Sequence, residues 1–120
     1  MNDPDLDDLK EKALETAYRL HAGSMYGGTI DGAFKALKRR CPGHDEADIA
    51  ACLRAAVEVQ QAVHAWLEEN SALAFEEYRK TDDAIEFSRI AAAFYAAHSR
   101  WPRAGLDALF GMNFLYFHLK

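Results

Sequence analysis

The chain has 120 residues and a net charge of −5; half of its residues are apolar and 28% are charged. This profile is typical of one globular domain with one hydrophobic core, and it excludes a disordered chain. The acidic balance also argues against nucleic-acid binding, because neutralising phosphates requires clustered Lys and Arg.

The first predicted helix covers residues 5–22. Its apolar positions recur at intervals of three and four residues and therefore share one face: Leu6, Leu9, Ala13, Ala17 and Leu20. Asp3 before Pro4 is a typical helix start. Gly23 is a typical helix end.

A shorter second helix is predicted from Thr29 or Asp31 to Arg40. Its inner face would carry Phe34, Leu37 and Cys41, and its outer face a basic stripe of Lys35, Lys38 and Arg39. Pro42 ends it, because the residue before a proline disfavours the helical conformation.

The third helix is predicted to be the longest, with Asp45 as its cap. Its seam has spacings of four, three, four, three and four: Ile49, Leu53, Ala56, Gln60, Val63 and Leu67. A stripe of small residues (Ala51, Ala55 and Ala62) predicts that a neighbouring helix packs closely against this one. After a bend or break at Asn70–Ser71, the helix continues to Lys80.

Two further helices complete the prediction. Thr81 or Asp82 caps a helix that runs to about Ser99, with apolar residues on two sides, so we expect it to be central. Residues 104–120 are read as a helix, since a lone strand would have no partner. The sequence therefore predicts an all-α fold: one domain over residues 1–120, an irregular bundle of five to six helices with one long central helix.

The ends of the chain and its cysteines bear on location. Residues 1–5 are acidic and no apolar stretch follows them, so we expect no secretory signal. No run approaches the ~18 apolar residues of a membrane span. Cys41 and Cys52 form neither a Cys-x-x-Cys pair nor a set of four ligands, which is typical of buried thiols in a reducing compartment. We expect a soluble cytoplasmic protein that does not bind membranes.

Acidic residues recur through the middle of the chain on predicted outer faces. The set is Glu68, Glu69, Glu76, Glu77, Asp82 and Asp83. Most surface charge of this kind is simply solvated. Complementary charge nevertheless speeds association and selects partners, so this set is a candidate docking surface for a basic protein.

A candidate ligand pocket lies between the long helix and the glycine-rich loop. Its polar lining would be His21, Tyr26, Gln60, His64 and Glu68. His64 and Glu68 are four residues apart, a spacing that can bring two metal ligands together. Neither Glu-x-x-His nor His-x-x-x-His occurs, however, so we expect no metal and no cofactor. Gln60 either bonds a neighbouring helix or lines this pocket; the first interpretation is favoured.

The glycine-rich loop before the second helix is a candidate anion site. Gly27, Gly28 and Thr29 would offer backbone N–H groups, and Lys35 a positive charge. The Gly-Lys-Ser/Thr sequence of a phosphate loop is absent. An ordinary helix connection, in which glycine supplies a positive φ, is therefore favoured.

No serine or cysteine lies in a nucleophile elbow or catalytic triad motif, so the sequence favours a protein that is not an enzyme. Our first hypothesis is a small acidic binding protein of the inhibitor or toxin-immunity type. The second is a small-molecule- or metal-binding helical protein, with enzymes included, that uses the pocket above. The third is a homo-oligomer held by the aromatic C-terminal helix.

Overall fold

The computed structural model describes residues 4–22, 28–81 and 85–119. These ranges form seven helices and no strand: α1 (Pro4–Ala22), α2 (Ile30–Arg40), α3 (Glu46–Glu69), α4 (Ser71–Thr81), α5 (Phe87–Ile90), α6 (Ala92–Ala97) and α7 (Arg103–Leu119). The all-α class is confirmed, whereas the predicted number of five to six helices was too low. None of the described helices is both long and apolar enough to cross a membrane.

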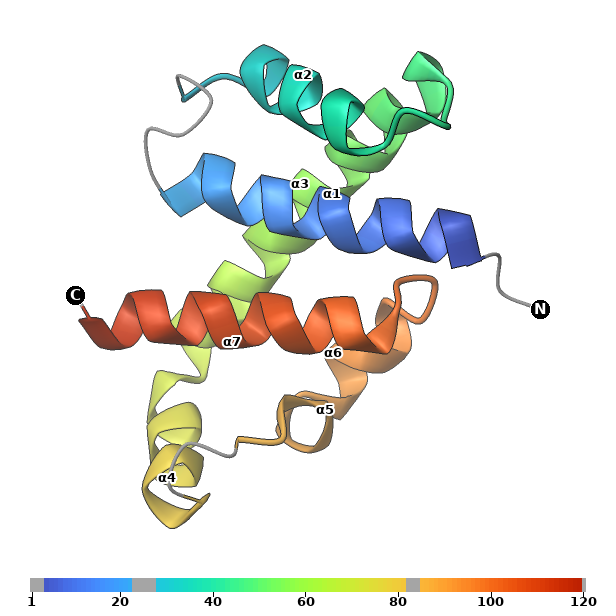
Figure 1. Ribbon diagram of the computed structural model, residues 1–120. Coiled ribbons are helices and arrows are strands. Elements are labelled where there is room, and N and C mark those ends of the chain that lie inside the picture. Colours follow the sequence, from blue (N-terminus) through green and yellow to red (C-terminus); the bar gives the residue numbers. More distant parts are fainter. Residues whose placement is uncertain (1–3, 23–27, 82–84, 120) are drawn as a thin grey trace.

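The helices form two crossing layers (Figure 1). α1 and α7 lie side by side, and α3 runs behind both of them, with α2 near its first half and α4 continuing from its end. The Cα positions extend over 43 × 36 × 20 Å. The shortest extent fits two layers of helices, since one helix with its side chains is about 10 Å across.

The seam predicted for α3 is its buried face. All six seam residues are buried, and Val59 joins them. They form one core with buried residues of the other helices, chiefly Leu9, Leu14, Leu37, Leu106, Leu109 and Phe110. The 3.6-residue period of the sequence therefore places α3 correctly against α1 and α7.

α1 and α7 approach closely at Gly105. A Cβ atom built at this position would lie 3.1 Å from Leu14 Cδ1 and 3.3 Å from Glu11 Cγ. A side chain at this position would therefore require Leu14 and Glu11 to shift by a few tenths of an ångström. Gly111, two turns further along α7, has no neighbour within 4 Å of such a Cβ atom.

α7 is part of the core. The Phe110 ring, fully buried, contacts the rings of Trp66, Phe87, Phe94 and Tyr95 at centroid distances of 5.5, 5.1, 5.1 and 5.5 Å. Aromatic pairs at these distances add to the free energy gained by burying their area. The helix predicted for the C-terminal residues is therefore confirmed, and it packs into the molecule.

Residues 81–99 differ from the prediction of one central helix. Thr81 is the last residue of α4, and its hydroxyl donates to the Glu77 carbonyl at 2.7 Å. The second half is broken at Ala91 (φ −113°, ψ 38°), which separates α5 from α6. Neither short helix is central, and α6 contains no buried residue. The stripe of small residues on α3 was also misread, because Ala51 and Ala55 are exposed.

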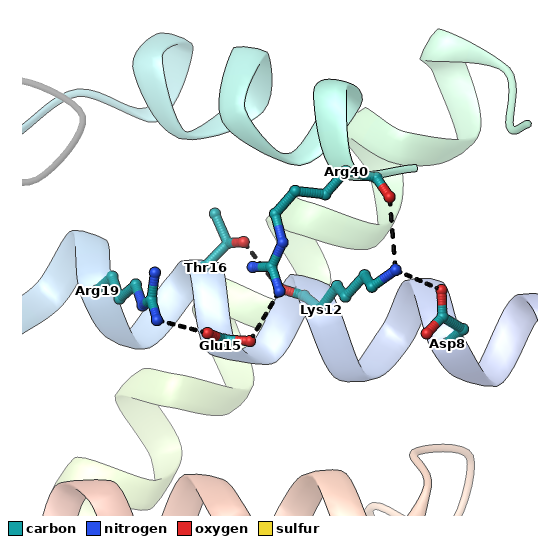
Figure 2. Close-up of polar contacts among 6 residues, drawn as sticks. All are labelled: Asp8, Lys12, Glu15, Thr16, Arg19 and Arg40. Atoms are coloured by element: carbon teal, nitrogen blue, oxygen red, sulfur yellow. Dashed lines mark hydrogen bonds and ion pairs between the residues drawn. The ribbon is translucent and has the colours of Figure 1, made fainter. Parts of the chain in front are cut away.

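A polar network ties α1 to α2 (Figure 2). Glu15 accepts hydrogen bonds from Arg19 on its own helix at 2.7 Å and from Arg40 on α2 at 3.1 Å. Lys12 pairs with Asp8 at 2.9 Å, and its ammonium lies 3.5 Å from the Arg40 carbonyl oxygen at the end of α2. Arg40, at the basic C-terminal end of α2, is therefore paired with a carboxylate of α1.

Candidate functional site

The buried amide predicted at Gln60 has its partner on α7. Gln60 Nε2 donates to Asn113 Oδ1, and Asn113 Nδ2 donates back to Gln60 Oε1, both at 2.8 Å. Asn113 Nδ2 also donates to the Leu109 carbonyl at 2.8 Å. Gln60 is 1% exposed and Asn113 is completely buried. Gln60 is therefore committed to holding α3 against α7, as the favoured interpretation expected, and does not line a pocket.

Three members of the predicted pocket do come together beside this pair. The His21 and His64 rings lie 4.7 Å apart, and His64 Nε2 is 2.5 Å from Glu68 Oε1. Tyr116 of α7 joins them, 6.1 Å from the His21 ring. The Glu68 side chain is 58% exposed, so this histidine cluster lies at the surface. Tyr26 lies outside the described residues.

The chemistry of the histidine cluster is limited. In the described part of the chain, no three His, Cys, Asp or Glu side chains are arranged to hold a metal ion. Nearby on α1, burial and the neighbouring Tyr116 raise the pKa of Tyr18, which keeps its phenol protonated. The cluster offers hydrogen-bonding groups to a ligand, but it has no activated nucleophile.

The predicted acidic set is only partly exposed. Glu68, Glu69 and Glu76 face solvent. Glu77, in contrast, is 8% exposed and forms an ion pair with Arg89 of α5, so its inclusion in an outer surface was wrong. Asp82 and Asp83 lie outside the described residues. The exposed members of the predicted set thus lie where α3 ends and α4 begins.

We call this region the acidic elbow: Glu68, Glu69 and Glu76, with Leu73 between them in the sequence. Asn70 forms the bend, with its backbone N–H and its side-chain amide both donating to the Trp66 carbonyl at 2.9 Å. Leu73 is 39% exposed, which makes it one of the few large apolar side chains at the described surface.

The sequence around the elbow is mostly acidic up to the last turn of α4, which carries Arg79 and Lys80. Residues 55–78 include five Glu and neither Lys nor Arg. The last turn of α3 carries no basic residue, so its carbonyl ends add to the negative potential. Lys80 partly offsets Glu76 through an exposed pair at 3.2 Å. The three carboxylates of the elbow outnumber this one lysine, so the elbow stays negative.

The predicted anion site is not assembled as one site. Gly28 has the positive φ (71°) expected of a connecting glycine, and Thr29 caps α2 by accepting a hydrogen bond from the Gly32 N–H at 3.0 Å. Lys35 is exposed six residues further on, roughly 9 Å along the helix axis. Gly27 lies outside the described residues. The Thr29 hydroxyl thus already serves the N-terminus where an anion would bind.

The two thiols and the phenol of Tyr95 are poor nucleophiles at neutral pH. Cys41 and Cys52 are free, and burial raises the pKa of Cys52 to about 11 and also raises that of Cys41. Burial and the hydrogen bond to Asp107 raise the pKa of Tyr95 as well. All three groups therefore stay protonated at neutral pH, where none is an active nucleophile or base.

Compared with protein families, curated proteins and solved structures, the chain matches none of them. The geometry and charge of the chain itself therefore carry the functional proposal.

Proposed function

We propose that the protein works by binding a basic protein partner through the acidic elbow, as a small acidic inhibitor or immunity-type protein does. The observation that carries the proposal is the elbow's combination of Glu68, Glu69 and Glu76 with the exposed Leu73, in a stretch without Lys or Arg. A reducing compartment such as the cytoplasm is part of the proposal, and the free thiols are compatible with it.

The elbow has the composition of a binding patch. A partner's basic side chains would meet Glu68, Glu69 and Glu76, which steers the encounter and raises the association rate. Leu73 would supply the apolar contact from which water is excluded on binding. Association should therefore weaken with increasing salt, because exposed charges are screened within about 10 Å at 0.1 M ionic strength.

The test compares two triple variants that each remove three negative charges. The elbow variant is Glu68→Gln/Glu69→Gln/Glu76→Gln. The matched control is Asp31→Asn/Asp45→Asn/Asp48→Asn, which changes exposed carboxylates near the other end of α3. Each tagged protein is isolated from its own cells, and the proteins that accompany it are quantified by mass spectrometry.

We expect the wild type and the control to retain the same basic protein and the elbow variant to lose most of it. Far-UV circular dichroism should be the same for all three, since the altered side chains are exposed. If the elbow variant retains the same proteins in the same amounts as the control, the proposal is wrong.

Both alternatives have less support. A pocket built around Gln60 would need an amide that is already bonded to Asn113. Of the aromatic residues from which self-association through the C-terminal helix was inferred, Phe110 and Phe114 are buried within the chain. The histidine cluster is what remains of the pocket hypothesis, and native mass spectrometry of the purified protein would reveal a ligand retained there.

A further inference from the structure

A groove runs between the first half of α1 and the turn that joins α6 to α7. It has a volume of about 850 Å³. Small-molecule sites in proteins commonly measure about 300–1,000 Å³, so the groove is large enough for a ligand of that size. It is independent of the acidic elbow, which none of its lining residues belongs to.

The charges in the groove are opposite to those of the protein as a whole. Lys10, Arg100 and Arg103 contribute three positive charges, and among the described residues that line the groove Asp7 is the one carboxylate. The chain as a whole carries a net charge of −5. A local excess of positive charge on an acidic protein favours an anionic ligand.

Among the described residues, no carboxylate lies closer than 4.0 Å to any of these three cations in an ion pair. The Lys10 ammonium donates to the backbone carbonyl of Arg100 at 2.6 Å, which holds the turn without neutralising the charge. Arg103 donates to the Ser88 hydroxyl at 2.8 Å, and the nearest carboxylates, Glu86 and Asp107, are 4.0 Å away. No hydrogen bond or ion pair within the described ranges engages the Arg100 guanidinium.

Cations on the other side of α1 behave differently. Lys12, Arg19 and Arg40 each lie 2.7–3.1 Å from a carboxylate oxygen. The three cations of the groove, unlike these three, remain available to a ligand.

Beside its charged residues and two serines, Ser88 and Ser99, the groove is lined by apolar and aromatic residues. Trp101 and Leu106 line it beside Leu6, which is 42% exposed. The Tyr95 ring is fixed in this wall by stacking on Phe110 and by its hydrogen bond to Asp107 at 2.6 Å. Specific sites commonly pair such apolar walls with a few placed polar groups.

We propose that this groove binds a small amphiphilic anion, in which one carboxylate or phosphate head group pairs with Arg100 and Lys10 while an apolar body packs on Trp101 and Leu6. Guanidinium groups form strong charge-assisted hydrogen bonds with either head group. The apolar body gains free energy from the surface that it buries.

The test uses one tail with four head groups: decanoate, decyl phosphate, decanol and decylamine, each kept below its micelle concentration. Trp101 reports binding, because the chain has two tryptophans and Trp66→Phe leaves Trp101 alone. Saturable changes in its fluorescence are expected with decanoate or decyl phosphate and not with decylamine. Whichever anion binds more tightly identifies the head group.

Two variants and one control locate the site. Arg100→Ala should weaken anion binding at least tenfold, since the head group loses a charge-assisted hydrogen bond. Asp7→Asn should strengthen it about threefold, because it removes a repelling charge. Arg79→Ala on α4 removes an exposed arginine that does not line the groove, so it should change nothing.

The proposal is overturned if decylamine or decanol binds as tightly as the anions, or if neither anion gives a saturable signal. It is also overturned if Arg100→Ala and Arg79→Ala bind the anions equally well. Arg100→Ala should keep its fold, because Lys10 bonds the backbone of Arg100 and not its side chain.

Discussion

Replacing one member of the Gln60–Asn113 pair should cost more than replacing both. Gln60→Leu removes two hydrogen bonds of 2.8 Å and leaves Asn113 Oδ1 buried without a donor. Asn113 Nδ2 would keep its bond to the Leu109 carbonyl. Because both side chains are at most 1% exposed, water cannot replace the lost partner without opening the core.

The magnitudes follow from the cost of unpaired buried groups, which is about 1–3 kcal/mol each. We expect Gln60→Leu to lower the free energy of unfolding by about 2 kcal/mol, and Asn113→Leu, which strands both ends of the Gln60 amide, by about 2–3 kcal/mol. The double variant Gln60→Leu/Asn113→Leu leaves no polar group behind. It should lie within about 1 kcal/mol of the wild type, which gives a coupling of about 3–6 kcal/mol.

Urea unfolding, followed by circular dichroism, gives the free energy of unfolding of all four proteins. The dependence of this free energy on urea concentration should be the same for all four, which checks that their folded and unfolded states are comparable. Additive losses, with the double variant less stable than either single variant by the other's full cost, would refute the reasoning. That result would mean that the two amides do not pair in the folded protein.

Three further predictions concern the core and the thiols. Gly105→Val should lower the free energy of unfolding by about 1–3 kcal/mol, because the added Cβ would lie 3.1 Å from Leu14 Cδ1. Gly111→Ala should raise the free energy of unfolding by about 0.5–1 kcal/mol, because its added Cβ would have no neighbour within 4 Å. Thermal unfolding measures both, and the opposite order would contradict the close contact of α1 with α7. Burial raises the pKa of Cys52 from 9.0 to about 11, so at pH 8 its thiol should react with iodoacetamide roughly a hundredfold more slowly in the folded than in the unfolded protein. Mass spectrometry measures the two rates, and equal rates would be incompatible with the burial of this thiol. This raised pKa contributes stability below pH 9.0 that is lost as the pH rises toward about 11, since the unfolded chain then releases the proton first. Deleting residues 114–120 should abolish cooperative unfolding, because Phe114 is 5% exposed in the core. A truncated protein that still folds as a monomer would show that the core does not need the end of α7.

The sequence was most informative where burial is periodic. In α3 the apolar seam and the isolated Gln60 within it predicted the buried face and the need for a polar partner. The partner itself was missed, because Asn113 lies in the nearly continuous apolar run 109–117, where no alternation marks an inner face. A single polar residue in such a run was the available signal, since a buried amide must be bonded.

Two features, the helix break at Ala91 and the burial of Glu77, depend on tertiary packing and are not encoded by local helix preference. Ala91 to Ala93 favour helix, so nothing local marks the break at Ala91; it occurs where Phe87 and Phe94 both pack on Phe110. Glu76 and Glu77 are adjacent in sequence and both looked exposed, yet successive helical positions point about 100° apart. α4 turns Glu77 toward Arg89 and leaves Glu76 outside, which no single-sequence pattern distinguishes.

The most direct test of the acidic elbow as a docking surface is site-specific photo-crosslinking in the protein's own cells. The photoreactive residue p-benzoylphenylalanine replaces Leu73 in one protein and Ala47, exposed in the first turn of α3, in the other. The account predicts one dominant crosslink from position 73, to a basic protein, and none to that protein from position 47. Crosslinks to the same proteins from both positions, or a dominant crosslink from position 73 to an acidic protein, would contradict it.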